Sequence, residues 1–140
     1  MTMRRCEMRR TLVTAAAVLT LTGCATTYGM PVEERSRAYR ADLDVVWVAA
    51  LDAVDDVDLA LTETEREHGR IRARAGGSIF DLRGHMLLVV ITDLGNGRVR
   101  VDANAESSSE DRIIDFGRSS GIVRDYLDAL DYRVEEAGGV

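Results

Sequence analysis

The sequence has no lysine, two cysteines, one proline and few aromatic residues, and these shortages exclude several classes of function. All 18 basic residues are arginines, and 24 acidic residues outnumber them, so the formal net charge is −6. An acidic chain is repelled by nucleic acid, so no nucleic-acid partner is expected. One tryptophan, four tyrosines and two phenylalanines are too few for a surface that stacks bases.

Long hydrophobic runs are also missing. Residues 11–23 carry no charge and follow four arginines, which is the order of the basic and apolar regions of a secretory signal. About a dozen apolar residues are too few to cross a bilayer, which needs roughly twenty. The sequence therefore predicts export, with the apolar run acting as part of a leader.

The uncharged run ends in Leu21-Thr22-Gly23-Cys24, which resembles the lipobox of bacterial lipoproteins. The resemblance implies cleavage between Gly23 and Cys24 and acylation of Cys24, which makes the membrane a partner through acyl chains. A plain signal peptide with a chance cysteine is the alternative. Twin-arginine export through Arg9-Arg10, and a start at Met3 or Met8, stay open.

Cleavage at this point would leave one small domain without a disulfide. Residues 24–140 hold 14 basic and 23 acidic side chains, a formal charge of −9, and no cysteine other than Cys24. The fold must therefore rely on its core. We expect a signal peptide over 1–23, a lipidated tether over 24–35, one domain over 36–136 and a disordered tail over 137–140.

Two stretches have the 3.6-residue apolar period of an amphipathic helix. Asp42 is the expected N-cap of the first helix, over 43–56, and Ser119 or Ser120 that of the second. The first apolar stripe is Leu43, Val46, Trp47, Ala50 and Val54. The second stripe is Val123, Tyr126, Leu127, Leu130 and Val134. Trp47, the single tryptophan, is expected to anchor the core.

The stretch before the first helix and several stretches between the two helices have the pattern of strands. They alternate or are wholly apolar over 37–41, 59–62, 71–75, 78–82, 86–91 and 98–105, with turns expected at Gly76-Gly77 and within 93–97. Residues 86–91 read MLLVVI, so this strand is central and covered on both faces, or on one face plus a partner. The predicted fold class is α+β, an antiparallel sheet of about four to six strands with two amphipathic helices packed on one face.

Residues 37–134 resemble an uncharacterised family of small bacterial envelope lipoproteins. The shared pattern is an aromatic strand, a helix with a Val-Trp pair and alanines, an isoleucine-rich strand, a hairpin and a C-terminal helix. Here it is carried by Tyr39, Val46-Trp47, Ala49-Ala50 and residues 69–73, 99–101 and 120–130. A strand followed by a Val-Trp helix is also similar to helix-grip folds that bind apolar ligands. Neither resemblance carries over a functional residue.

Metal and catalytic chemistry are only weakly indicated. Glu65, Glu67 and His68 sit together without a second ligand set at zinc-like spacing, and the aspartates of 52–58 lack the series of an EF-hand. Residues 117–121 (GRSSG) match the Gly-x-Ser-x-Gly spacing of a nucleophile elbow, but Ser119 and Ser120 lack an adjacent histidine signal. We therefore expect no cofactor, no metal and no catalytic residue.

The leading functional hypothesis is a non-catalytic, membrane-anchored interaction or assembly module of the cell envelope. It would dock an envelope protein partner through a free sheet edge or through an apolar patch formed by Ile113, Ile114 and Phe116. Ala25 follows Cys24, where an aspartate typically retains a lipoprotein at the inner membrane. The resemblance thus implies the outer membrane, facing the periplasm, in a diderm host, and otherwise the outer face of the cell membrane.

Two alternatives belong to other classes. The first is a small apolar-ligand-binding lipoprotein, with unfilled volume beneath Trp47 and Tyr126 between helix and sheet. The second is a carboxylate-based hydrolase, which needs a cleft that holds two carboxyls with separated pKa values. Its acid and base would be Glu65 with Glu67, or Glu110 with Asp111.

Overall fold

Five strands form one antiparallel sheet in the described part of the chain. The structure, a computed structural model, describes residues 30–76, 84–107 and 117–140. The strands are β1 (Ser36–Arg40), β2 (Ala60–Glu65), β3 (Arg70–Ala75), β4 (His85–Gly95) and β5 (Arg98–Ser107). Their order across the sheet is β1-β5-β4-β3-β2, so β4 is central, as its wholly apolar sequence predicts.

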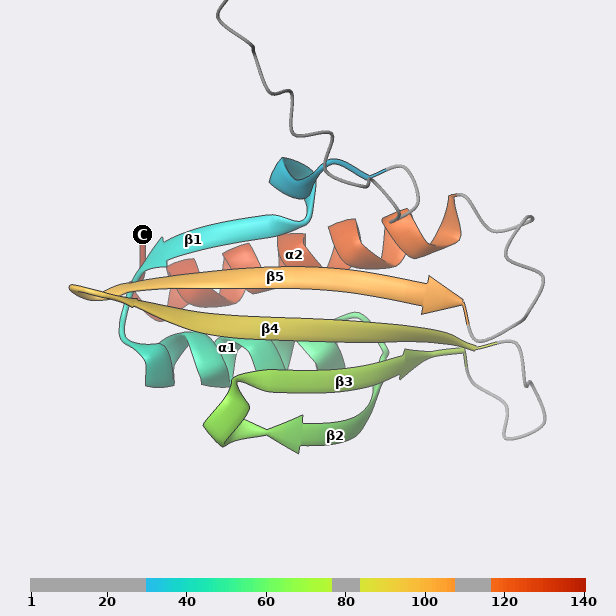
Figure 1. The fold of residues 1–140 in the computed structure, drawn as a ribbon, viewed down its shortest axis with the longest axis horizontal. Helices are drawn as coiled ribbons and strands as arrows, with labels where there is room; N and C mark the ends of the chain where they lie inside the picture. The colour runs from blue at the N-terminus through green and yellow to red at the C-terminus, as the bar shows by residue number, and fades with distance from the viewer. Residues whose placement is uncertain (1–29, 77–83, 108–116) are drawn as a thin grey trace, which may run out of the picture.

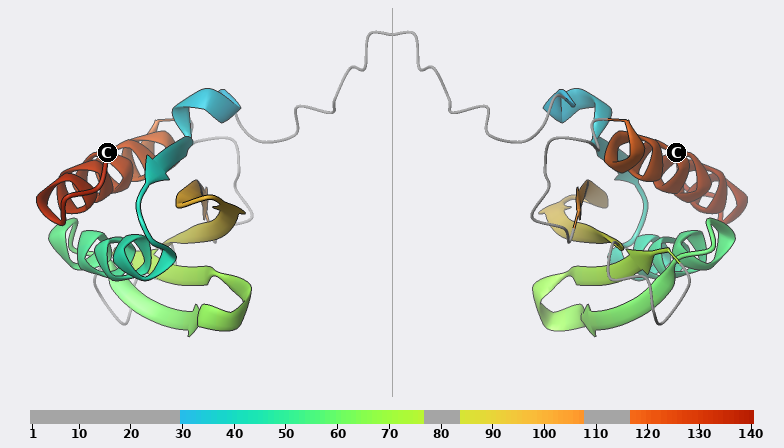
Figure 2. Two further views of the ribbon diagram at one scale, coloured as in Figure 1. Left: turned by 90° about the vertical axis from the view of Figure 1, so that its left-hand side faces the viewer. Right: turned by 90° about the vertical axis from the view of Figure 1, so that its right-hand side faces the viewer.

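Both helices lie on the same face of this sheet. They are α1 (Leu43–Asp56) and α2 (Arg118–Glu136), and two 3₁₀ turns, η1 (Val32–Glu34) and η2 (Arg66–His68), complete the described elements. Figure 1 looks onto the other face, with the helices behind the strands, and Figure 2 shows the helix layer beside the sheet layer. The predicted α+β fold with two helices on one face is therefore confirmed.

The core lies between the two layers and is filled from alternate strand positions. Leu87, Val89 and Ile91 point from β4 toward the helices, and Val99 and Val101 join them from β5. All of these are buried, as are the five stripe residues predicted for α2 and four of the five predicted for α1. Burial of these side chains is the main stabilising contribution, at roughly 1.5–3 kcal/mol for each large one.

The ends of the helices differ from the sequence prediction in two places. Leu43 is 39% exposed, because it is the first residue of α1 and lies at the rim of the layer. Gly117 is the N-cap of α2, where the Gly121 N–H donates to its carbonyl oxygen. Ser119 and Ser120 therefore lie inside the first turn, and the prediction that one of them is the N-cap is wrong. Asp42 does occupy the N-cap position of α1, without a hydrogen bond from its side chain.

The turns also refine the prediction. β4 continues to Gly95, and the chain reverses at Asn96-Gly97, which have φ angles of 55° and 67°. Two positive φ angles are typical of the two-residue turn that Asn-Gly favours. β5 extends to Ser107. The strand expected over 78–82 and the residue Gly77 lie outside the described residues, and β3 pairs directly with β4.

Residues 137–140 have defined contacts, although the sequence predicts a disordered tail. The Gly139 N–H donates to the Val134 carbonyl oxygen at 2.9 Å. The Arg40 N–H donates to the Val140 carbonyl oxygen at 2.6 Å, and the Val140 N–H donates back to the Arg40 carbonyl oxygen at 3.4 Å. These bonds hold the segment against the outer edge of β1. The expected disorder is thus not what the structure shows for these residues.

Gly69 joins η2 to β3 at a position that admits no side chain. Its φ is +62°, and a Cβ built on it would lie 2.1 Å from the Ile91 carbonyl oxygen. We expect Gly69→Ala to lower the free energy of unfolding by about 2 kcal/mol or more, because backbone strain and this clash add. Urea denaturation followed by circular dichroism measures the change.

The matched control is Gly97→Ala. Gly97 has a φ of +67°, and a methyl group at this position would have no other atom within 4 Å, so only the backbone strain of about 1–2 kcal/mol applies. If both variants lost the same free energy of unfolding, the close approach of Gly69 to the Ile91 carbonyl would make no contribution to the loss in Gly69→Ala.

Candidate functional site

The residues that the sequence nominates most strongly lie outside the described residues. These are the lipidation residues Gly23 and Cys24 and the patch Ile113, Ile114 and Phe116. Glu110 and Asp111 lie outside them too. The described residues offer other candidates: a cleft beside Trp47, a small pocket at the start of α2, a groove between the helices, and the uncovered face of the sheet.

The cleft beside Trp47, called the Trp47 cleft below, has a volume of about 310 Å³. This is at the lower end of the range for small-molecule sites. It lies where the first turns of α1 meet η2 and the middle of β4. Its lining residues are Leu43, Trp47, Arg66, Glu67, His68, Gly69, Val90, Ile91, Thr92 and Asp93.

The close contact of η2 with β4 fixes one wall of the cleft. Gly69 takes the left-handed conformation that ends η2, and its carbonyl oxygen accepts a hydrogen bond from the Ile91 N–H at 2.7 Å. The turn therefore lies directly against the sheet. This contact places the side chains of η2 above the start of α1.

Arg66 covers Trp47 from this wall. The guanidinium carbon of Arg66 lies 5.6 Å from the centroid of the Trp47 ring, within the distance of a cation–π interaction. The same guanidinium forms an ion pair with Asp44 in the first turn of α1. Trp47 itself is only 6% exposed. The cleft thus lies over a largely buried tryptophan, and its rim carries Arg66 together with the acidic residues Glu67 and Asp93.

His68 pairs with Glu65 beside this cleft. His68 Nδ1 lies 3.3 Å from Glu65 Oε2, and Arg70 contacts the same oxygen at 3.7 Å. Glu67 and His68 line the cleft, whereas Glu65 does not. Within the described residues no group of three or more metal-binding side chains is present.

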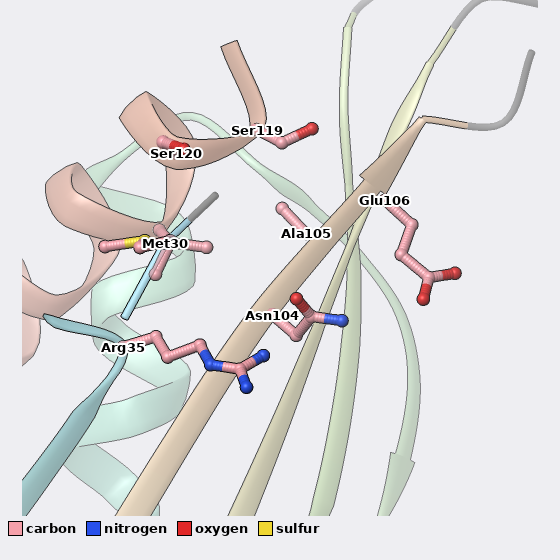
Figure 3. Close-up of a pocket in the computed structure, with 8 residues that line it drawn as sticks. Met30, Arg35, Asn104, Ala105, Glu106, Ser119 and Ser120 are labelled. Atoms are coloured by element: carbon pink, nitrogen blue, oxygen red, sulfur yellow. The ribbon is translucent and has the colours of Figure 1, made fainter. Parts of the chain in front are cut away.

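A second pocket lies at the start of α2 and is shown in Figure 3. Its volume of about 30 Å³ is enough for about one water molecule. The lining residues come from the segment before β1, from β5 and from α2: Met30, Arg35, Asn104, Ala105, Glu106, Ser119, Ser120 and Val123. This pocket therefore marks where the chain enters the fold, and it is too small for an organic ligand.

The groove between the helices, about 420 Å³, is rimmed by charged residues. Nearby, two Arg133 nitrogens each lie 2.6 Å from an oxygen of Asp56. This hydrogen-bonded pair joins α1 to α2, and it lowers the pKa of the Asp56 carboxyl below its usual 3.8. The groove is thus bordered by a contact that joins the two helices.

Two tyrosine hydroxyls brace the helix layer. Tyr126 donates to the Ala50 carbonyl oxygen at 3.2 Å, and Tyr39 donates to Asp131 at 2.6 Å. Burial raises the pKa of both phenols, and for Tyr39 the Asp131 carboxylate raises the pKa further. Both hydroxyls therefore remain protonated, and their role in the fold is structural.

The uncovered face of the sheet, called the open face below, is the largest candidate surface. Residues of β4 that point away from the helices are Met86, Leu88 and Val90, and each is partly exposed. Their neighbours on β3 are arginines and on β5 are mainly acidic or amide residues. The MLLVVI run is the sequence signal for this apolar surface.

Comparisons with known proteins give a fold likeness and no family. No family model and no curated protein matches the chain. A solved structure of the adenylate sensor from AMP-activated protein kinase, in complex with 5-aminoimidazole-4-carboxamide 1-beta-D-ribofuranotide, is similar with a TM-score of 0.50 and 11% identity. The match covers 68% of this chain and 94% of that one. At this identity the likeness concerns the fold alone.

Neither α1 nor α2 has the character of a membrane span. Among the described residues, no helix combines the length and the apolar composition that crossing a bilayer requires.

Replacing Arg66 tests the geometry of the Trp47 cleft. Arg66→Ala should move the fluorescence emission of the single tryptophan to longer wavelength, because water reaches the ring face that the guanidinium covers. The unfolding free energy should fall by less than about 1 kcal/mol, since the ion pair is exposed. Arg124→Ala is the control, because Arg124 forms an exposed ion pair with Glu34. Equal emission in both variants would contradict the cation–π contact.

Proposed function

We propose that the chain is a bacterial lipoprotein anchored through acyl chains on Cys24. Its folded domain would serve as a non-catalytic interaction or assembly module of the cell envelope. The observation that carries this proposal is the uncharged run that follows four arginines and ends in Leu21-Thr22-Gly23-Cys24. Charge order, run length and the final tetrapeptide all agree with a lipoprotein leader.

The spacing between Cys24 and the fold supports a tethered domain. The described fold begins at Met30, which packs against the core, six positions after Cys24, and six extended residues span at most roughly 20 Å. A domain held by this tether stays within about its own diameter of the membrane surface. Two or three acyl chains anchor a protein firmly, whereas one binds only marginally.

The open face supports an interaction role for the domain. A sheet with one face covered by helices leaves its other face for solvent or for a partner. Met86, Leu88 and Val90 are apolar residues at the centre of that face, where a solvated face usually carries polar side chains. By the resemblance to envelope lipoproteins, the domain faces the periplasm from the outer membrane in a diderm host, and otherwise lies outside the cell membrane.

The anchor is tested by comparing the expressed protein with a Cys24→Ala variant. Intact mass should place the first residue of the wild type at Cys24 and add the mass of the lipid, and fractionation should find the protein in membranes. The variant should keep its leader or become soluble. A soluble, unlipidated wild type would refute the anchor and leave Cys24 as a free thiol.

The Trp47 cleft favours a second candidate function, the binding of a small apolar ligand. Its floor is the Trp47 ring and its volume is about 310 Å³. An apolar body could lie against the ring, and the Arg66 guanidinium at the rim suits a carboxylate end. The cleft lies at the end of the helix–sheet interface, whereas the sequence hypothesis places the ligand beneath Trp47 and Tyr126.

Decanoate titration tests this candidate. Saturable quenching of the Trp47 emission is expected, because the chain holds no other tryptophan. Leu43→Glu, which adds a carboxylate at the mouth of the cleft on a residue that is 39% exposed, should weaken binding at least about tenfold by charge repulsion. The Val48→Glu variant is the control on the outer side of α1. No saturation, or equal affinity in both variants, excludes the cleft.

A further inference from the structure

The open face has a regular arrangement of charge across its three central strands. Side chains of paired residues share a face, so the register of β3, β4 and β5 sets three parallel columns on it. The arginine column is Arg70, Arg72 and Arg74; the apolar column is Val90, Leu88 and Met86; and the acid–amide column is Asp102, Asn104 and Glu106. Each of these three rows thus reads arginine, apolar residue, acid or amide, and the next β5 residue on this face, Arg100, is paired with Asp102.

The apolar column lacks a cover among the described residues. β4 alternates between fully buried residues under the helices and partly exposed residues on the open face. Its MLLVVI sequence is typical of a strand that is covered on both faces. The described helices cover one face only (Figure 2), so among the described residues the second face is available to a partner.

A second copy of the same chain matches the three columns. Consider two sheets packed face to face, related by a twofold axis that lies between them and runs close to the direction of β4. This axis places β4 over β4, and β3 of each copy over β5 of the other. We propose that the chain forms a homodimer through its open face in this way, with apolar columns in contact and each arginine column opposite an acid–amide column.

The register makes the opposed residues specific. Rows are preserved by this axis, so Arg74 faces Glu106 of the second copy and Arg70 faces its Asp102. A twofold axis perpendicular to the strands would instead set the arginine columns against each other, which like-charge repulsion disfavours. The open face is thus complementary to itself in one of the two symmetric orientations.

The usual angle between packed sheets is compatible with these contacts. Aligned sheets cross at about −30°, and adjacent rows on one face are roughly 6.8 Å apart. The outer rows are therefore displaced by about 3.5 Å relative to the central row at Leu88. A flexible arginine side chain spans this displacement.

The ion pairs of Arg70 and Arg72 within one copy leave both side chains able to bind across the interface. Arg72 contacts Glu63 at 2.9 Å, and Arg70 contacts Glu65 at 3.7 Å. Their side chains remain 47% and 51% exposed, and a guanidinium has five N–H donors. Asp102 accepts hydrogen bonds from Arg100 and Ser36 and is also exposed at its outer side, at 38%.

The area of the open face sets the strength of the contact. Five strands and six residues per strand cover roughly 24 by 20 Å, or about 1,000 Å² for both copies. This is the lower limit for a specific interface, so the dimer should be weak and concentration-dependent. If the proposed lipid anchor holds, confinement to a membrane raises the effective concentration.

Cross-linking of the full chain tests the dimer in cells. Leu88 lies on the proposed axis, so Leu88→Cys should join two copies through a short bismaleimide and give a band of twice the monomer mass. The wild type controls for Cys24, and Val48→Cys, on the outer side of α1 and 55% exposed, controls for random collision. The cross-link can be measured whether the chain is in the membrane or in solution. A failure of the proposed anchor can therefore be distinguished from a failure of the proposed dimer.

Charge reversal makes the test specific for the opposed columns. In the Leu88→Cys chain, Arg74→Glu or Glu106→Arg alone should lower cross-linking about tenfold. The twofold axis repeats the contact between positions 74 and 106, so each single reversal places two pairs of like charges across the interface. The double reversal should restore it to within about twofold. Val90→Lys, which leaves both charged columns intact, should also abolish the cross-link. Thermal unfolding of each variant verifies that it folds.

Three results would overturn the proposal. They are the absence of a Leu88→Cys cross-link beyond the Val48→Cys level, a cross-link that charge reversal leaves unchanged, and a product whose mass shows a different protein in place of a second copy.

Discussion

The structure depends on the burial of one face of β4 and β5 beneath the two helices. The strands supply small and medium apolar residues at every second position, and the helices supply Trp47, Tyr126 and their neighbours. With no disulfide available after residue 24, this interface holds the described residues together. Because both described helices lie on one side of the sheet, the same packing leaves the open face on the other side.

The sequence predicts the elements well where a period is long and regular. The stripes of α1 and α2 span three or more turns, and nine of the ten nominated residues are buried. The exception, Leu43, lies at a helix end, where the period has no further turn to support it. The predicted N-cap of α2 was wrong for a related reason. Serine side chains favour N-cap positions, but packing further along the chain sets where the helix begins.

The candidate surfaces were less predictable than the fold. Strand pairing is not encoded locally, so the sequence could indicate that residues 86–91 need a cover without showing that arginines stand on one side and acids on the other. The Trp47 cleft depends on η2 meeting β4, through a glycine whose conformation has only a weak local signal. By contrast, the resemblance of residues 21–24 to a lipobox is a local pattern that needs no tertiary structure, and it is the strongest functional signal in the sequence.

The two edges of the sheet are unequal in a way that bears on fibre formation. β2 is exposed along its length and carries a bulge between Leu61 and Glu63, whereas the outer edge of β1 at Arg40 already bonds the backbone of Val140. Edge-to-edge growth of a sheet needs two receptive edges on every molecule. A strand that approaches β1 would have to displace residue 140, and the bulge distorts the other edge. The arrangement of the two edges therefore disfavours open-ended growth of the sheet.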